Sequence, residues 1–245
     1  MAHDPLSALE AHSIHVIREA YARLKPLGML WSLGKDSNTM LWLVRKAFVG
    51  RVPFPVVLLD TGNEFDEVYA FRDRYVKEWG LDYINAACPG VEETDATLPP
   101  ASRAAARKTL GLKRLIAERG FAGMLLGIRR DEQAIRGKER YMSPRDADGR
   151  WHVRVHPLLA WTELDVWRYV QRENIPVCEL YFSRGGKRFR SLGEKDITFP
   201  VASNASSIDE IIAELETTRQ EERAGRAMDH EREDAFERLR AAGYM

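Results

Sequence analysis

The chain has 245 residues, and its 37 lysines and arginines balance its 37 aspartates and glutamates. Because no net field is available to hold a polyanion, extended binding of nucleic acid or of a membrane surface is not expected. The amino terminus lacks a basic segment followed by an apolar one, and no apolar run approaches the roughly 18 residues of a membrane span. We therefore expect a cytoplasmic protein that is long enough to bury a sizeable core.

Helical and extended segments alternate along the chain. Strands separated by helices predict parallel pairing with right-handed crossovers, and so an α/β fold with a doubly wound parallel sheet and flanking helices. Val56 to Leu59 is continuously apolar, as expected of a strand covered on both faces. In chain order, the sequence predicts helices over 6–24, 66–79 and 108–119, and strands over 29–31, 56–59, 82–85, 124–126 and 151–156.

After Ile208 the pattern changes to a charged helical tail, with apolar Ile211, Ile212 and Leu215 on one side. Such a helix either exposes its charged face to solvent or offers it to a partner. We predict an adenine-nucleotide-binding α/β domain over 1–205 and a helical C-terminal extension over 206–245.

The stretch Ser32-Leu33-Gly34-Lys35-Asp36-Ser37 lies between a predicted strand and an apolar-periodic segment. Backbone N–H groups at the start of a helix are unpaired, and the helix dipole adds positive potential, so an anionic phosphate can bind there and Lys35 can neutralise it. The stretch therefore predicts a phosphate loop for a nucleotide, although a turn with a helix N-cap has the same composition. Asp36 either caps the helix or holds the loop. Neither G-x-x-x-x-G-K-[ST] nor G-x-G-x-x-G occurs, which excludes a Walker NTPase and a dinucleotide site.

Three candidate residues share a position in the predicted sheet. Ser32, Asp60 and Gly127 each follow a strand. In a doubly wound sheet, ligands bind beyond the carboxyl ends of the strands. The three are therefore expected at one site. Asp60 has two possible roles there, since it can bind a ribose hydroxyl or hydrated Mg²⁺, or only cap the turn into the next helix.

The loop sequence Ser-x-Gly-Lys-Asp-Ser resembles the pyrophosphate-binding loop of ATP pyrophosphatases. Within that superfamily, which includes phosphoadenylyl-sulfate reductases, the chain is most similar to sulfate adenylyltransferase subunit 2, the small subunit of heterodimeric ATP sulfurylase. The resemblance continues in order along the chain, at 9–19, 45–48, 58–62, 127–132, 138–140, 157–158, 161–167, 189–193 and 201–205.

The resemblance implies an adenine nucleotide alpha hydrolase-like fold and adenylyl transfer from ATP to sulfate, which gives adenylyl sulfate and pyrophosphate as the first step of sulfate assimilation. It implies ATP with Mg²⁺ as ligands and a GTP-binding large subunit as partner, since this chain has no GTP-binding P-loop. The nucleotide-binding residues expected from the loop and the resemblance are Ser32, Leu33, Gly34, Lys35, Asp36, Ser37, Asp60, Gly62, Gly127 and Arg129.

The chemistry of this reaction requires cations. Sulfate is a poor, dianionic nucleophile, so its attack on the α-phosphorus brings negative groups together. Arg129 and Arg130 follow Gly127 at a strand end, where guanidinium groups can bind phosphate or sulfate oxygens through two parallel hydrogen bonds. We predict Lys35, Arg129 and Arg130 as the catalytic groups. The alternative for the arginine pair is surface ion pairing with the acidic residues that follow.

Other polar residues give weaker signals. Arg136, Lys138 and Arg140 lie in a basic stretch that either captures anions or forms solvated surface. His12 and His15 lie in the first helix without carboxylate support, so packing or surface roles are expected. Cys88 and Cys178 stand far apart without a C-x-x-C, so neither a disulfide framework nor a metal site held by protein side chains is predicted.

The chain departs from the family pattern in three respects, namely two missing insertions taken together and two local replacements. It lacks insertions that longer members carry around 149–151 and 183–186. Glu194 stands where the family usually has a cysteine, and Asn63-Glu64 stands where Trp-Lys is frequent. The acceptor and the partner contacts therefore stay open at this point.

Three rival functions follow from the same loop. A phosphoadenylyl-sulfate reductase-like enzyme needs a catalytic C-terminal cysteine, which the end of this chain lacks. An FMN-type adenylyltransferase shares an arginine-rich strand end but does not account for the stretch over 161–167. A non-catalytic nucleotide-binding protein is the third possibility.

Overall fold

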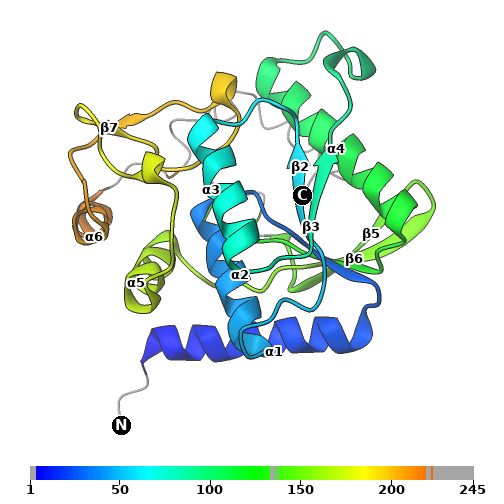
Figure 1. The fold of residues 1–245 in the computed structure, drawn as a ribbon, viewed down its shortest axis with the longest axis horizontal. Helices are drawn as coiled ribbons and strands as arrows, with labels where there is room; N and C mark the ends of the chain where they lie inside the picture. The colour runs from blue at the N-terminus through cyan, green and yellow to red at the C-terminus, as the bar shows by residue number, and fades with distance from the viewer. Residues whose placement is uncertain (1–3, 133–135, 137, 219–221, 223–245) are drawn as a thin grey trace.

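The computed structural model describes residues 4–132, 136, 138–218 and 222. A six-stranded sheet with the order β3-β2-β1-β4-β6-β5 forms its centre (Figure 1). All neighbouring pairs are parallel except β5 with β6, so the predicted doubly wound parallel sheet is confirmed with an antiparallel edge added. The strands are β1 (Leu27–Leu30), β2 (Val56–Asp60), β3 (Tyr83–Ala87), β4 (Gly123–Leu125), β5 (Met142–Ala147) and β6 (Arg150–Val155), and a separate small pair is β7 (Lys187–Arg188) with β8 (Val201–Ala202).

Helices cover both faces of the sheet. α4 lies on one side of the strands, and α2 and α3 lie on the other, with α1 running along the edge of the layer (Figure 1). α4 begins earlier than the predicted 108, because Pro100 occupies its first turn, where a missing N–H costs nothing. The helices are α1 (Pro5–Arg23), α2 (Lys35–Ala47), α3 (Asp66–Glu78), α4 (Pro100–Arg119), α5 (Glu163–Glu173) and α6 (Ile208–Thr217), with single 3₁₀ turns at Val91–Glu93, Glu179–Tyr181 and Lys195–Ile197.

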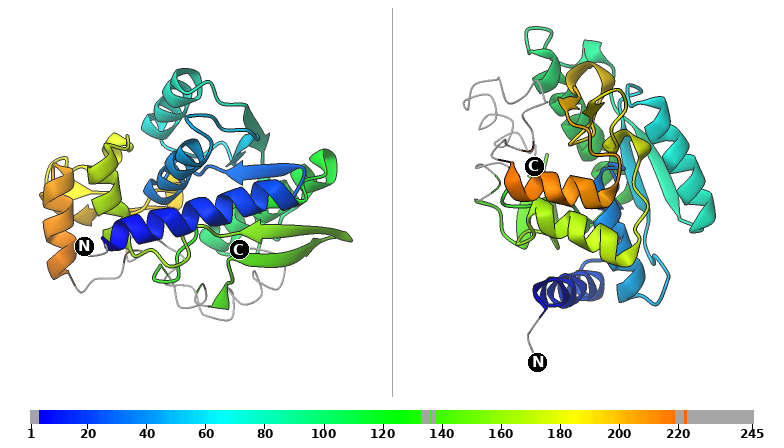
Figure 2. Two further views of the ribbon diagram at one scale, coloured as in Figure 1. Left: turned by 90° about the horizontal axis from the view of Figure 1, so that it is seen from below. Right: turned by 90° about the vertical axis from the view of Figure 1, so that its left-hand side faces the viewer.

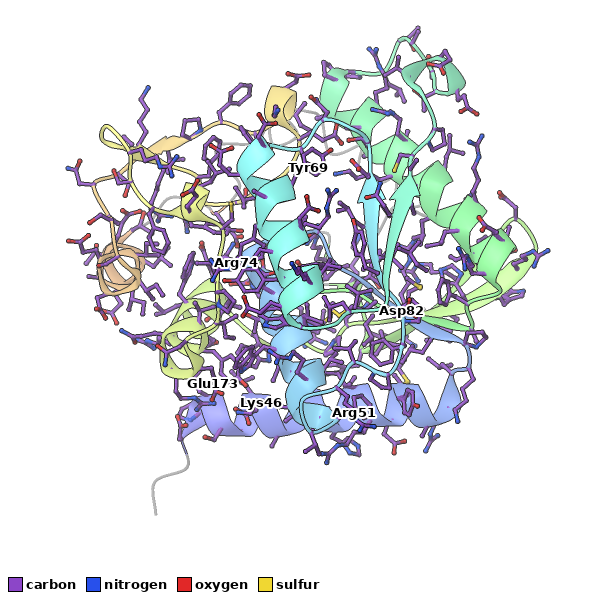
Figure 3. The ribbon with its side chains drawn as sticks, in the orientation of Figure 1. Lys46, Arg51, Tyr69, Arg74, Asp82 and Glu173 are labelled. Carbon is purple, nitrogen blue, oxygen red and sulfur yellow. The ribbon has the colours of Figure 1, made fainter. Side chains whose placement is uncertain are left out.

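The two faces have separate cores. The larger core joins α1, α2, α3, α5 and α6 to one face of the sheet and includes fully buried Trp31 and Trp167. The smaller core packs Leu115 of α4 against Val57 and Met124 of the sheet. Polar contacts reinforce the helix layer, as where Lys46 of α2 meets Glu173 of α5 at 3.0 Å (Figure 3).

β5 is the strand of the sheet that the sequence did not predict, and it forms a hairpin with β6, which lies where a strand was predicted over 151–156. Asp148 and Gly149 connect the two strands with φ values of 54° and 85°. Two successive residues with positive φ form the turn that matches the twist of an antiparallel pair. β5 thus precedes β6 along the chain as the antiparallel edge strand of the sheet.

The C-terminal helix packs on the body of the protein. Ile211 is fully buried, and Ile208, Ile212 and Leu215 pack against the larger core. α6 lies alongside α5 (Figure 2). The apolar side of the predicted tail helix is thus used for packing. The division at 205/206 stays a prediction, and 219–221 and 223–245 lie outside the described residues.

Among the described residues, no helix combines the length and the apolar character needed to cross a bilayer.

The order of the strands reverses between β1 and β4. β1 is followed by β2 on one side, whereas β4 pairs with it on the other, with Met29 opposite Leu125. The loops that leave these two strands meet at the carboxyl edge. A Cβ on Gly127 would lie 3.1 Å from Ser37 N and 3.2 Å from the carbonyl carbon of Asp36. Only a glycine lets the chain after β4 approach the start of α2 this closely, and this crevice is where such sheets bind ligands.

Gly127→Ala tests this close approach. Because the added methyl group meets backbone rather than a movable side chain, we expect a loss of about 1–3 kcal/mol in the free energy of unfolding and weaker ATP binding. Gly34→Ala is the matched control for stability, since its Cβ would meet Tyr181 Oη at an ordinary 3.4 Å. Thermal unfolding with and without ATP provides the measurement. Equal stability of Gly127→Ala and the unchanged protein would contradict the contact.

Candidate nucleotide-binding site

The predicted phosphate loop lies between β1 and α2. Gly34 is the N-cap of α2 and no side chain caps the helix, so its first N–H groups depend on other partners. One is already used, because Lys35 N donates to Tyr181 Oη at 2.8 Å. The Ser37 hydroxyl donates to Gly34 O at 3.0 Å and holds the turn closed. Leu33 has a φ of 64° and turns its side chain into the core, so only its backbone can face a ligand.

Lys35 is a buried cation at the centre of this site, with 1% of its surface exposed. Its ammonium group contacts the carboxylate of Glu222 and donates to the backbone O of Arg190 at 3.3 Å. It also lies 3.5 Å from Asp36 and 3.9 Å from Glu163. Burial of an ammonium group is tolerated only with such compensation.

Arg129 is fully buried beside Lys35. Its Nε donates to Asp131 at 2.9 Å, and its two terminal nitrogens contact Asp36 and Glu222. Burial disfavours the charged guanidinium, but the surrounding carboxylates, Glu222 foremost, raise the pKa of Arg129 above its ordinary value. Asp36 therefore holds the loop and does not cap α2, which decides between its two predicted roles.

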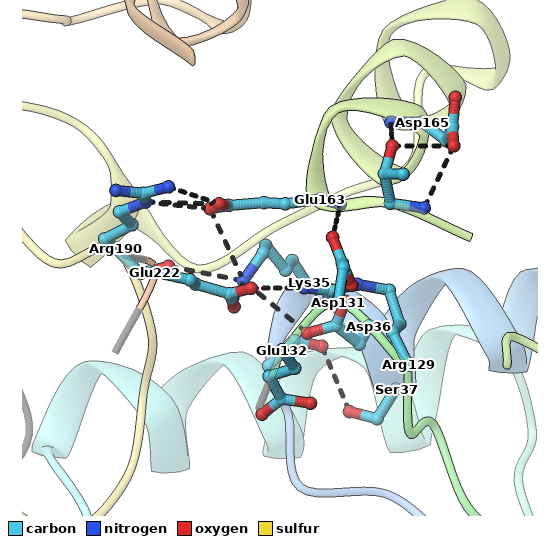
Figure 4. A network of polar contacts seen from close by, with 12 residues as sticks. Lys35, Asp36, Ser37, Arg129, Asp131, Glu132, Glu163, Asp165, Arg190 and Glu222 are labelled. Carbon is cyan, nitrogen blue, oxygen red and sulfur yellow. Dashed lines mark hydrogen bonds and ion pairs between the residues drawn. The ribbon is translucent and has the colours of Figure 1, made fainter. Parts of the chain in front are cut away.

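Glu222 places a carboxylate where the sequence predicts a phosphate. One oxygen contacts Lys35 and the other contacts Arg129 (Figure 4). Burial opposes ionisation, but the two cations hold the pKa of Glu222 well below its ordinary value, so the group is an anion. The position between Lys35 and Arg129 therefore already holds the oxygens of one anion, the Glu222 carboxylate.

A second layer of contacts fixes the first. Arg190 pairs with Glu163 of α5, with a shortest distance of 2.8 Å, and both are buried. The second oxygen of Asp131 accepts from the N–H of Glu163 at 2.7 Å (Figure 4). Asp131 therefore connects Arg129 to the start of α5. Arg129, the first residue of the predicted arginine pair, therefore has a structural role as well as an electrostatic one, because ion pairs orient its guanidinium group.

A cavity of about 250 Å³ opens beside these groups. One end is polar and includes the loop, Lys35 and Glu222, and the other is apolar and lies between α4 and the sheet. The polar lining residues are Ser32, Gly34, Lys35, Asp36, Ser37, Glu64, Lys108, Thr109, Gly127, Glu132, Arg136, Arg154, Tyr181, Ser191, Gly193 and Glu222. The apolar lining residues are Leu30, Trp31, Val57, Leu58, Leu59, Leu112, Leu126, Ile128 and Leu192.

The structure brings most of the predicted residues to this cavity. Arg129 lies directly against the lining groups Asp36 and Glu222. Arg130 lies elsewhere, exposed, with its guanidinium 5.7 Å from the ring of Tyr141. The predicted residues that line the cavity are Ser32, Gly34, Lys35, Asp36, Ser37 and Gly127.

Asp60 and Gly62 also lie outside the cavity lining. The carboxylate of Asp60 accepts from Gly62 N and from the hydroxyl of Tyr69, both at 2.8 Å, and from Asn85 at 3.1 Å. Partial burial by itself raises the pKa of Asp60, but these hydrogen bonds bring it below its ordinary value. Tyr69 lies near the start of α3 (Figure 3). These contacts are the ones expected if Asp60 caps the turn that leads into α3.

The basic stretch after β4 divides. Arg136 lines the cavity and pairs with Glu132, whereas Lys138 and Arg140 are exposed. Arg136 is therefore positioned to contact an anion in the cavity, whereas Lys138 and Arg140 lie on the solvated surface.

Several functional residues were not predicted. Arg190 lies in a stretch that resembles the family, so its position was available as a signal. Arg154 is a buried arginine on β6, and a charged residue inside a predicted strand next to the arginine-rich stretch was a usable signal. Glu222 and Tyr181 reach the loop from sequence separations of 187 and 146 residues, which no local pattern reveals.

Fold and loop together define an α/β nucleotide-binding protein. The profile of the phosphoadenosine phosphosulfate reductase domain family matches residues 26–200. Sulfate adenylyltransferase subunit 2 of Pseudomonas paraeruginosa (strain DSM 24068 / PA7) is 38% identical over 297 aligned positions, which cover 98% of this chain and 97% of the relative. The protein of the same name from Rhizobium johnstonii is 37% identical, with 98% and 93% covered. The chain belongs to the sulfate adenylyltransferase subunit 2 family of nucleotidyltransferases.

The length of the alignment bears on the family insertions. It spans 297 positions, more than the 245 residues of this chain, so the Pseudomonas relative carries segments that this chain lacks. The expectation that this chain is shortened is confirmed, although the alignment length does not locate the missing segments.

Solved structures confirm the fold. Candida glabrata FMN adenylyltransferase in complex with ATP superposes with a TM-score of 0.60 at 21% identity, covering 80% of this chain and 63% of that one. The phosphoadenylyl-sulfate reductase of Candida auris, a phosphate complex, gives 0.58 at 15% identity, covering 80% and 97%.

Glu222→Gln tests whether the carboxylate occupies an anion site. Since a phosphate must replace Glu222 to contact both cations, we expect pyrophosphate to bind about tenfold more tightly, or by about 1.4 kcal/mol. The free energy of unfolding should fall by about 1–3 kcal/mol, because two buried cations lose a charged partner. Calorimetry and thermal unfolding measure the two effects.

The control is Glu216→Gln, which removes the same charge from the exposed pair with Arg168 and should change neither quantity. Weaker pyrophosphate binding in Glu222→Gln would mean that Glu222 positions the cations and does not compete with the ligand.

Proposed function

We propose that this chain transfers the adenylyl group of ATP to sulfate, with release of pyrophosphate, as the nucleotide-binding subunit of a two-subunit enzyme. The observation that carries the proposal is the oxyanion site formed by Lys35 and Arg129 at the switch point of the sheet, in a chain similar to sulfate adenylyltransferase subunit 2 over nearly its whole length. The proposal locates the enzyme in the cytoplasm, where ATP is supplied.

The cavity suggests how ATP lies. Its apolar end between α4 and the sheet suits the base, and the loop at the carboxyl edge suits the β- and γ-phosphates, which leave as pyrophosphate. Lys35 and Arg129 then neutralise the charge that develops as the bond to the α-phosphorus breaks. Sulfate attacks that phosphorus directly, so no protein nucleophile is required, and positioning with charge stabilisation supplies the rate.

Mg²⁺ is part of the proposal as a companion of ATP. No cluster of three or more His, Cys, Asp or Glu side chains that could hold a metal occurs within the described ranges. Mg²⁺ typically keeps several waters and binds substrate phosphates with one or two carboxylates. No step is therefore assigned to a metal held by the protein alone.

The reaction free energy is the reason for proposing a partner subunit. The phosphosulfate anhydride is less stable than the ATP bond that is broken, so formation of adenylyl sulfate is uphill. The relatives are named subunit 2, which implies a second subunit. We propose that this partner binds GTP and couples its hydrolysis to adenylyl transfer.

The rival functions fit the site less well. The pKa of the Cys88 thiol is raised to about 11 by burial, and burial also raises that of Cys178, so neither is the activated thiolate that a reductase needs. The resemblance to FMN adenylyltransferase is one of fold at 21% identity.

The full chain, alone and with its co-purified partner, tests the function through ATP- and sulfate-dependent pyrophosphate release and labelled adenylyl sulfate. We expect little product from the chain alone and a GTP-dependent increase with the partner. Lys35→Ala should remove ATP binding and product together. Full activity of the purified chain without GTP or partner would replace this proposal with a self-sufficient adenylyltransferase.

Arg129→Lys tests the geometry of the guanidinium at constant charge. An ammonium group cannot reproduce the planar fork whose three nitrogens reach Asp131, Asp36 and Glu222, so we expect kcat/KM to fall about 100-fold. Arg130→Lys is the comparison. The sequence assigned Arg130 the same role, but its exposed position beside Tyr141 makes a fall of less than about threefold the expected result. Equal losses in steady-state assays of the two variants would place Arg130 in the reaction.

A further inference from the structure

An ion cluster of two buried glutamates, Glu64 and Glu194, and the half-buried Lys108 lies at the cavity, which Glu64 and Lys108 line. Lys108 Nζ is 3.1 Å from an oxygen of Glu64 and 3.4 Å from an oxygen of Glu194. Glu64 and Glu194 are 4% and 5% exposed, and Glu64 and Lys108 line the cavity. Two carboxylates share one ammonium group, so the cluster favours a ligand that donates hydrogen bonds.

Glu64 has an oxygen to offer. Its Oε1 accepts from Lys108 at 3.1 Å, and none of the hydrogen bonds observed among the described residues goes to its Oε2. Asp60, four residues earlier, is in the opposite situation, because hydrogen bonds from Gly62, Tyr69 and Asn85 occupy both of its oxygens. Of Asp60 and Glu64, only Glu64 lines the cavity.

The depth of Glu64 in the cavity matches the middle of a nucleotide. α4 follows β3 and precedes β4, two parallel strands, so it starts at the carboxyl edge and runs back along the sheet. Lys108 is therefore nearer that edge than Leu112 by one turn, about 6 Å. A base against Leu112 and the apolar floor puts its ribose at the level of Lys108 and Glu64, with the phosphates beyond it at the loop.

We propose that Glu64, and not Asp60, supplies the carboxylate that accepts hydrogen bonds from the ribose hydroxyls of the nucleotide. The inference rests on the proposed nucleotide function and adds one residue to it. In dinucleotide-binding doubly wound folds an acidic side chain accepts a hydrogen bond from the ribose 2′-hydroxyl, which is the role assigned to Glu64. The contact between Lys108 Nζ and Oε1 orients the Glu64 side chain.

The test compares ATP with 2′,3′-dideoxy-ATP by calorimetry on the full chain. The ratio of the two dissociation constants is read within each variant, so a general loss of stability does not alter it. We expect a ratio of about 10 in the unchanged protein, or about 1.4 kcal/mol. Glu64→Ala should bring the ratio close to one, and Glu64→Gln, which keeps an acceptor without the charge, should give an intermediate value.

Asp60→Asn is the matched variant and should keep the ratio of the unchanged protein, whatever it does to the affinity for ATP itself. A ratio near one in the unchanged protein, or an undiminished ratio in Glu64→Ala, overturns the assignment. Loss of the ratio in Asp60→Asn alone would transfer the role to Asp60. Failure of the unchanged protein to bind ATP would instead contradict the proposed function.

Discussion

Two cations buried side by side, Lys35 and Arg129, impose the constraint that the rest of the structure satisfies. An ammonium or guanidinium group removed from water is stable only where carboxylates surround it. Here the carboxylates come from separate parts of the chain, and Glu222 lies 187 residues from Lys35 in sequence. The site is consequently one of the points at which α2, the segment after β4, α5 and Glu222 are held together.

The charge balance of this network is compatible with the proposed phosphate site. Apart from Glu222, its carboxylates match its cations one for one, with Asp36, Asp131 and Glu163 against Lys35, Arg129 and Arg190. Glu222 adds one negative charge to this neutral group through its contacts with Lys35 and Arg129. Replacement of Glu222 by a phosphate exchanges one anion for another and leaves the remaining pairs intact.

The sequence predicted the parts of this site that depend on neighbouring residues. The loop, the helix that follows it and the position of Gly127 were predictable, because strand, turn and helix signals are local. Asp60 and Arg130 show the limit. Both residues lie at or after the end of a strand, as the sequence predicted. Whether each side chain turns toward the cavity depends on partners such as Tyr69 and Tyr141, which only the fold brings near. The β5–β6 hairpin carried a local signal, Asp148-Gly149, that the alternation of helices and strands obscured.

The backbone of the phosphate loop is itself maintained by the core. Leu33 has a φ of 64°, a left-handed conformation that costs about 1–2 kcal/mol for a residue with a Cβ atom. Its side chain is fully buried, and burial of a leucine contributes about 1.5–3 kcal/mol, which offsets that cost. A glycine at this position would adopt the same φ without strain, but it would provide no side chain to fix the turn. The core therefore holds the loop in the conformation that presents the start of α2 to the cavity before any ligand arrives, and a site formed in advance loses less entropy on binding.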